Sequence, residues 1–159
     1  METITKSPEE TEEMGKRIAN SLKGGETFAL QGELGSGKTT FIKGLAVELG
    51  IEQRIISPTF IIVRRYVISP ITNHSPSRRL SRARGQSPVT NFYHIDLYRL
   101  ELNVESEVKN LGIKDIWNNQ TNIVAIEWAE KIKDLIPKSA TWIKFENLEE
   151  DKRKISVNL

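Results

Sequence analysis

The glycine-rich stretch GELGSGKT at residues 32–39 constrains the fold more than any other part of the sequence. It matches the pattern G-x-x-x-x-G-K-[ST], in which a loop joins a strand to the start of a helix. Both neighbours fit this context, because TFAL at residues 27–30 is a strand-forming run and residues 39–49 carry apolar side chains at helical spacing before Gly50. The stretch therefore predicts an α/β fold built around a phosphate-binding loop.

The residue types in this loop each suit a part of phosphate binding. Its glycines let the backbone curl so that N–H groups point at phosphate oxygens, and the following helix N-terminus adds positive potential. Lys38 is expected to reach the β and γ phosphates, and Thr39 to offer its hydroxyl to Mg²⁺. The predicted nucleotide-binding segment comprises Glu33, Leu34, Gly35, Ser36, Gly37, Lys38, Thr39 and Thr40. The alternative is a glycine-rich turn that merely joins a strand to a helix.

Strand-like and helix-like segments alternate along the rest of the 159-residue chain. Residues 7–10 begin a helix with a serine N-cap, a first-turn proline and a capping-box glutamate. Runs rich in β-branched and aromatic residues predict strands at 60–66, 91–96, 122–126, 141–145 and 154–159, and helices are expected around 105–111 and 129–136. We predict one P-loop domain over residues 1–159, with three layers, a central mostly parallel (mixed) sheet and a C-terminal antiparallel hairpin.

Composition excludes several classes of site. The chain has no cysteine and only two histidines, so disulfides, thiolate chemistry and a cysteine-based zinc site are ruled out. Any metal is expected to be a hard cation held by oxygen atoms. The acidic, polar N-terminus lacks the features of a secretory signal, and no apolar run approaches the roughly 20 residues that span a bilayer. We therefore expect a cytoplasmic protein with no membrane partner.

Residues 67–90 differ from the rest of the chain. They contain three prolines, five serines, four arginines (Arg78, Arg79, Arg82 and Arg84) and no acidic residue. Four of the 23 basic residues and none of the 21 acidic residues lie here, so the remainder carries a net charge of −2. Such a segment without hydrophobic periodicity is normally functional or flexible, and we expect a flexible basic insertion between two strands.

Two carboxylates are candidates for the magnesium site. Asp96 closes the strand NFYHID, and Glu127 follows the apolar strand NIVAI, so both should emerge near the phosphates. Either could instead be a solvated acid at the end of a strand.

Three further residues have two interpretations each. Thr59, in the stretch Ser57-Pro58-Thr59, could sense the γ-phosphate, although a Ser-Pro stretch is more often only a turn. His94 is better explained as a packed or hydrogen-bonded histidine than as a catalytic base. Trp128 could belong to the core or line the site.

Two motifs of other nucleotide-binding proteins are missing from the sequence. The chain has no Asn-Lys-x-Asp pattern, which recognises guanine in G proteins, and this favours ATP as the nucleotide. It also has no HRD-type element of a protein kinase.

Four stretches together resemble one family. They are GELGSGKTTF, SPTF at residues 57–60, FYHIDLYRLE at 92–101 and AIEWAEKI at 125–132. In this order they are similar to TsaE, the small bacterial P-loop ATPase required for making threonylcarbamoyladenosine in tRNA. The sequence departs from the family at Glu33 and Ser36, where Asp and Ala are usual, at residues 64–66, where Asn-Glu-Tyr is common, and in the inserted segment.

The resemblance implies a set of roles. Lys38 and Thr39 would bind phosphate and Mg²⁺, Thr59 would belong to a switch-like loop, Asp96 would act as the Walker-B-type carboxylate, and Glu127 and Trp128 would complete the nucleotide site. Asp96, Glu127 and Thr59 are thus the predicted catalytic residues, and Thr39, Asp96 and Glu127 the predicted metal ligands. The implied partners are the TsaD and TsaB proteins, with tRNA reached through the complex. ATP hydrolysis would support tRNA modification and would be weak without the partners.

Two other functions remain open at this point. A small-molecule kinase would also use a P-loop, but it should show an acceptor pocket and an arginine-bearing lid. A nucleotide-dependent nucleic-acid binder would use the arginines of residues 67–90 to contact phosphates. In the TsaE interpretation those arginines either contact tRNA or belong to an inert solvated insertion.

Overall fold

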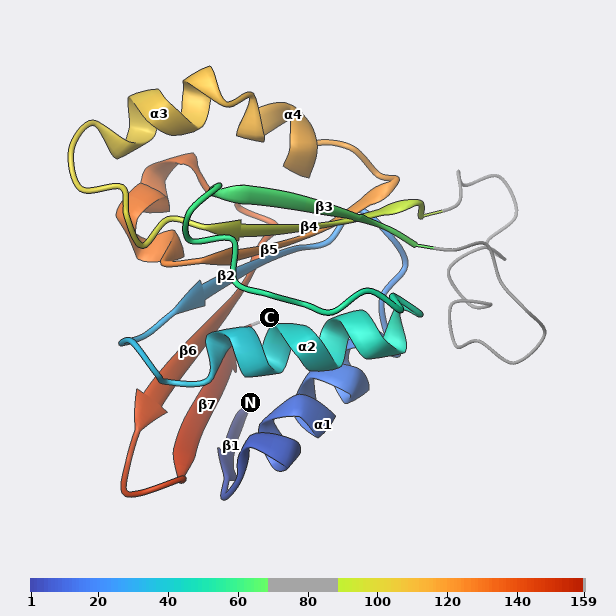
Figure 1. Ribbon diagram of the computed structural model, residues 1–159, viewed down its shortest axis with the longest axis vertical. Helices are drawn as coiled ribbons and strands as arrows, with labels where there is room; N and C mark the ends of the chain where they lie inside the picture. The colour runs from blue at the N-terminus through green and yellow to red at the C-terminus, as the bar shows by residue number, and fades with distance from the viewer. Residues whose placement is uncertain (69–88, 159) are drawn as a thin grey trace.

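The computed structural model describes residues 1–68 and 89–158, and within them seven strands form one mixed sheet (Figure 1). The strands lie in the order β1-β7-β6-β2-β5-β4-β3. Their bounds are β1 Glu2–Thr5, β2 Thr27–Gln31, β3 Val63–Val67, β4 Asn91–Asp96, β5 Asn122–Glu127, β6 Thr141–Asn147 and β7 Arg153–Asn158. The central strands β6, β2, β5 and β4 are parallel, and β3, β7 and β1 pair antiparallel at the two sides. The predicted mostly parallel sheet and C-terminal hairpin are confirmed.

Helices cover both faces of this sheet (Figure 1). One face carries α1 (Pro8–Ala19) and α2 (Lys38–Glu48). The other carries α3 (Val104–Asn110), α4 (Ile113–Trp117) and the 3-10 helix η2 (Ala129–Leu135). Because side chains alternate along a strand, Phe28 and Leu30 of β2 enter the apolar core between the sheet and the helices α1 and α2. Ala29 enters the apolar core on the opposite face, under α3, α4 and η2. The sheet is therefore the middle of three layers.

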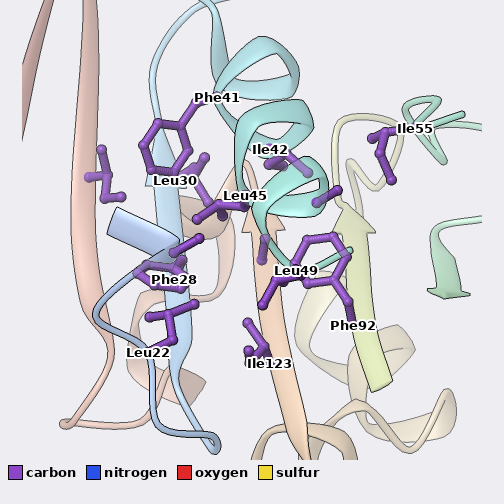
Figure 2. Close-up of a cluster of buried hydrophobic side chains, with 14 of the residues drawn as sticks. Leu22, Phe28, Leu30, Phe41, Ile42, Leu45, Leu49, Ile55, Phe92 and Ile123 are labelled. Carbon is purple, nitrogen blue, oxygen red and sulfur yellow. The ribbon is translucent and has the colours of Figure 1, made fainter. Parts of the chain in front are cut away.

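Apolar side chains of α2 dock the helix on the centre of the sheet. Figure 2 shows Phe41, Ile42, Leu45 and Leu49 directed toward side chains of β2, β5 and β4, and all four are buried. Their spacing places them on one side of the helix, as the sequence predicts. This packing holds the first turn of α2, and with it the glycine-rich loop, at the end of β2.

Two glycines let α1 approach α2 closely. A Cβ atom at Gly15 would lie 2.2 Å from the carbonyl oxygen of Phe41, and one at Gly44 would lie 1.9 Å from the carbonyl oxygen of Glu12. Neither distance leaves room for a methyl group, so the contact between these helices depends on glycine at both positions.

Some predicted elements were wrong in extent or type. The strand predicted at 60–66 begins only at Val63, because the N–H groups of Ile61 and Ile62 both donate to the carbonyl of Pro58 and form a turn. The helix predicted at 129–136 is a 3-10 helix that ends at Leu135. Strand β1 and helix α4 were not predicted, and β1 exists through pairing with β7 at the far end of the chain.

The basic insertion lies mostly outside the described residues. Val67 ends β3, and the Ile68 N–H donates to the Thr90 carbonyl at 2.9 Å, so the two ends of the segment are adjacent. The flexibility predicted for this insertion concerns residues 69–88, which lie outside the described part of the chain and include Arg78, Arg79, Arg82 and Arg84. None of the helices in residues 1–68 and 89–158 is both long enough and apolar enough to cross a bilayer.

Candidate functional site

The glycine-rich loop leaves β2 and turns directly into α2 at one end of the sheet (Figure 1). Gly37 caps the helix with a φ of 101°, a conformation that residues with a side chain rarely adopt. Gly32 is needed for space, because a Cβ there would lie 2.4 Å from the carbonyl oxygen of Phe145 on β6. The two glycines thus set the path by which the loop passes from β2 into the first turn of α2, whose N–H groups border the loop.

Lys38 is folded back onto its own loop. Its Nζ donates to the carbonyl oxygens of Gly32 and Glu33, each at 2.8 Å, and lies 4.2 Å from the centre of the Trp128 ring. Burial lowers the pKa of Lys38, and this effect outweighs the opposing attraction of Glu127, Glu130 and Asp96. A residue only 4% exposed therefore carries an ammonium group that is poorly hydrated and held by two carbonyls that a phosphate could replace.

The two predicted carboxylates are adjacent. Strands β4 and β5 are parallel neighbours, and Asp96 is the register partner of Glu127, so both acids end their strands side by side. Glu127 reaches α2, where its Oε1 accepts a 2.8 Å hydrogen bond from the Thr39 hydroxyl. The same Oε1 lies 2.8 Å from Nε2 of His94, which is fully buried on β4. His94 is thus packed and hydrogen-bonded, which is the interpretation that the sequence favoured over a catalytic base.

Asp96 holds the stretch that contains Ser57 and Thr59. Its Oδ2 accepts hydrogen bonds from Ser57 Oγ and from Thr59 Oγ1, the latter at 2.5 Å. The two hydroxyls also contact each other at 2.7 Å. The remaining oxygen, Oδ1, accepts the backbone N–H of Tyr98 at 2.9 Å. Asp96 therefore joins the loop before β3 to the loop after β4.

Two residues of the site were missed by sequence reasoning. The centres of the Tyr98 and Trp128 rings are 5.1 Å apart. Lys131 Nζ donates to the carbonyls of Leu97, Tyr98 and Leu100 at 2.6 to 3.1 Å, which ties the loop after β4 to η2. Tyr98 stands two residues after Asp96 in the sequence, a spacing that could have marked it. Lys131 lies within AIEWAEKI, one of the four stretches that carry the family resemblance, and that position could have marked it.

A cavity of about 280 Å³ lies between the glycine-rich loop and the ends of β4 and β5. Its lining consists of Leu34, Gly35, Ser36, Gly37, Lys38, Thr39, Thr40, Ser57, Thr59, Asp96, Tyr98, Glu127 and Trp128. The structure thus brings together every predicted site residue except Glu33, which contributes its carbonyl to Lys38. A smaller cavity of about 150 Å³ shares Gly35, Gly37 and Thr40 with it and is completed by Pro8, Thr11, Asp151 and Arg153.

Another cavity, of about 520 Å³, is mainly apolar and lies between β1 and α1. None of the predicted site residues lines it, so its size does not mark it as the site of chemistry.

Hard oxygen donors at this site fit Mg²⁺. In the described part of the chain no cluster of three or more His, Cys, Asp or Glu side chains could cage a metal alone. Mg²⁺ does not need such a cage at nucleotide sites, because it is held by one or two carboxylates or hydroxyls together with phosphates and water. The Thr39 hydroxyl and the Glu127 carboxylate, which are hydrogen-bonded to each other, provide one hydroxyl and one carboxylate for such a site.

Comparison with known proteins assigns the chain to a family. A family model described as "Threonylcarbamoyl adenosine biosynthesis protein TsaE" matches residues 5–155. The chain belongs to the TsaE family. The resemblance drawn from the four sequence stretches is therefore confirmed.

Relatives agree over almost the whole chain. The tRNA threonylcarbamoyladenosine biosynthesis protein TsaE of Bacillus subtilis is 33% identical over 152 residues, which cover 96% of this chain and 81% of that protein. TsaE of Treponema pallidum is 31% identical and covers 99% of both chains. The crystal structure of Bacillus subtilis YdiB superimposes with a TM-score of 0.70 at 28% identity, covering 98% of this chain and 82% of that one. The TsaE-family fold is thus shared along with the sequence.

Proposed function

We propose that this TsaE-family protein binds Mg–ATP in the cavity at the glycine-rich loop. We further propose that it hydrolyses ATP as a component of tRNA threonylcarbamoyladenosine synthesis, acting with TsaD and TsaB. The observation that carries the proposal is the meeting of Lys38, Thr39, Asp96 and Glu127 in one cavity, although they come from three different segments of the chain. The proposed pathway rests on family membership, and the proposed binding and hydrolysis of Mg–ATP rest on the residues that line the cavity.

Phosphate binding follows from the state of Lys38. Its ammonium group is desolvated and bonded to two loop carbonyls, which are weaker partners than a doubly charged phosphate. Exchanging those carbonyls for β- and γ-phosphate oxygens satisfies the charge without first removing it from water. The smaller cavity adjoins the same loop and offers room for part of the nucleoside, with Asp151 and Arg153 at its border.

Thr39 and Glu127 are the proposed residues that hold the metal, directly or through water. Mg²⁺ at that position would offset the negative charge on the phosphates. Asp96 has a different environment, since both of its oxygens already accept hydrogen bonds from protein groups. We assign Asp96 to holding Ser57 and Thr59 beside the γ-phosphate position, where their hydroxyls can respond to nucleotide.

A partner surface borders this cavity. Leu34 on the glycine-rich loop is 69% exposed, and Phe60, directly after Thr59, is 79% exposed with Arg99 stacked 3.9 Å over its ring. Ile56 and Ile61 on the same loop are also exposed. Apolar side chains gathered around a nucleotide site suit a protein partner that senses or completes that site. We propose that TsaD and TsaB contact the chain there and that tRNA is reached through them.

The test is a reconstitution with TsaD and TsaB. ATP turnover and threonylcarbamoyladenosine formation would be measured for the wild type, for Lys38→Ala and for Lys43→Ala. Lys43 is an exposed lysine five residues further along α2 and serves as the matched control. We expect Lys38→Ala to lose both activities because it removes the phosphate contact, and Lys43→Ala to keep them. Full activity of Lys38→Ala would refute the proposed site.

A further inference from the structure

His94 is a fully buried imidazole on β4 that contacts Glu127, and the proposed function does not use it. Its position follows from the sheet register. His94 and Asp96 lie on the same face of β4, and their register partners on β5 are Ala125 and Glu127. Alanine opposite His94 leaves room for the ring, and the ring then reaches diagonally to the Glu127 carboxylate, with Nε2 2.8 Å from Oε1.

The two hydrogen bonds to Glu127 both end on one oxygen. Oε1 is bonded to Thr39 Oγ1 from α2 and to His94 Nε2 from β4, each at 2.8 Å. Among the described residues, the only buried side-chain polar atoms without a hydrogen-bond partner are Arg64 Nε and His94 Nδ1. Oε2 has no partner there either and is not one of those buried atoms, so it is open to the cavity that Glu127 lines. Within the described part of the chain, the carboxylate thus has one oxygen held by two hydrogen bonds and one oxygen without a hydrogen-bond partner.

Hydrogen-bond roles define the state of the ring. An ionised carboxylate only accepts hydrogen bonds, so Nε2 must carry the hydrogen that points at Oε1. Nδ1 has no hydrogen-bond partner in residues 1–68 and 89–158, so no bond to that atom competes for the orientation of the ring. Within the sheet the imidazole can turn little, because it is enclosed on all sides. His94 is therefore a rigid donor aimed at one atom of Glu127.

We propose that His94 is a positioning residue, which together with Thr39 anchors Oε1 of Glu127 so that Oε2 faces the metal and the attacking water. The inference rests on the proposed function of this cavity. Without His94, the single anchor left on Oε1 among the described residues would be the Thr39 hydroxyl, whose oxygen is also a proposed ligand of Mg²⁺. Glu127 could then rotate about its terminal bonds, and metal binding would weaken while the phosphate contacts of Lys38 remained.

The experiment measures Mg²⁺ binding separately from nucleotide binding. A fluorescent ADP analogue is titrated first in EDTA and then at increasing Mg²⁺, with the wild type, His94→Leu, His94→Gln and Phe92→Leu. Gln can place an amide N–H near the position of Nε2, whereas Leu cannot. Phe92 is a buried residue on the same face of β4 whose loss weakens the core without touching Glu127, so it controls for stability.

The expected pattern is specific to metal. In EDTA all four proteins should bind the analogue within about twofold of each other, since the loop is unchanged. Loss of a group that orients a metal ligand commonly weakens metal binding by 10–100-fold, so His94→Leu should need at least about tenfold more Mg²⁺. His94→Gln and Phe92→Leu should stay within about threefold of the wild type. Equal Mg²⁺ requirements for His94→Leu and the wild type, or the same loss in Phe92→Leu, would overturn the inference.

A measurement that keeps His94 in place covers the case in which His94→Leu fails to fold. Nitrogen-15 spectra of the histidine ring should show the hydrogen on Nε2, and this signal should change when Glu127→Gln is introduced. A hydrogen on Nδ1 in the wild type would overturn the inference even if nucleotide binds normally. If the wild type bound no analogue with or without Mg²⁺, the proposed function itself would fail, which is a distinguishable result.

Discussion

Gly44→Ala tests whether the position of the glycine-rich loop depends on the close contact between α1 and α2. The new Cβ would lie 1.9 Å from the carbonyl oxygen of Glu12 and 2.8 Å from its carbonyl carbon. Even close C···O contacts in proteins are about 3.3 Å or longer, so the helices must separate by more than an ångström. Both neighbouring atoms belong to the backbone, so no side chain can move aside to make room.

The magnitude is the balance of three effects. Alanine is favoured over glycine in a helix by about 1 kcal/mol, and burying one methyl group adds about 0.8 kcal/mol. Overpacking typically costs about 1–3 kcal/mol and occasionally more, and this clash is severe because it forces apart a helix pair. Parting the helices would also loosen the packing of Phe41, Leu45 and Met14 in the shared core. We expect the forced separation and the loosened packing to cost about 4 kcal/mol together. After the gain of about 1.8 kcal/mol, this leaves a net loss of about 2 kcal/mol in the free energy of unfolding, or roughly 4–8 °C in Tm for a domain of this size.

Urea denaturation followed by circular dichroism would measure this loss, with Lys43→Ala as the control. Lys43 precedes Gly44 on α2 but is exposed, so its substitution should change the free energy of unfolding by less than about 0.5 kcal/mol. The m-value should stay constant if both variants remain two-state. An unchanged or higher midpoint for Gly44→Ala would show that the helices can part freely and would refute the reasoning.

The remaining predictions concern the site. Glu127→Gln should keep the fold and reduce ATP turnover by about 10²-fold or more, because a neutral amide binds the metal more weakly than a carboxylate does. Steady-state kinetics at saturating Mg²⁺ would show this, and normal turnover would remove Glu127 from the site. Asp96→Asn should also lower turnover, and limited proteolysis should show the loop at residues 57–59 released, since the amide cannot accept both hydroxyl hydrogen bonds as well as the carboxylate does; an unchanged cleavage pattern would argue against that role. TsaD and TsaB should accelerate ATP hydrolysis, as activators do for other P-loop proteins, and equal rates with and without them would contradict the proposed partner surface.

The sequence alone determined the framework of this protein. The glycine-rich loop, its strand and its helix are encoded within about twenty consecutive residues, and the strands β4 and β5 are marked by local β-branched and aromatic runs. The carboxylates at the ends of those strands follow from position alone, because parallel strands end at the same edge of a sheet. Family membership was likewise readable from four short stretches. The catalytic roles of Asp96, Glu127 and Thr59 remain predictions.

Tertiary structure alone decided how these pieces act on one another. Thr39 and Glu127 are 88 positions apart, and Thr59 and Asp96 are 37 apart, so no local pattern shows that these side chains share hydrogen bonds. The same holds for β1, which pairs with β7, the last strand in the sequence, and for Lys131, which holds the loop after β4. The anchoring of one oxygen of Glu127 by His94 depends on which strands are neighbours and on their register. Helical and strand periodicities arise from neighbouring residues, whereas these contacts exist only once distant segments have packed into one sheet with its helices.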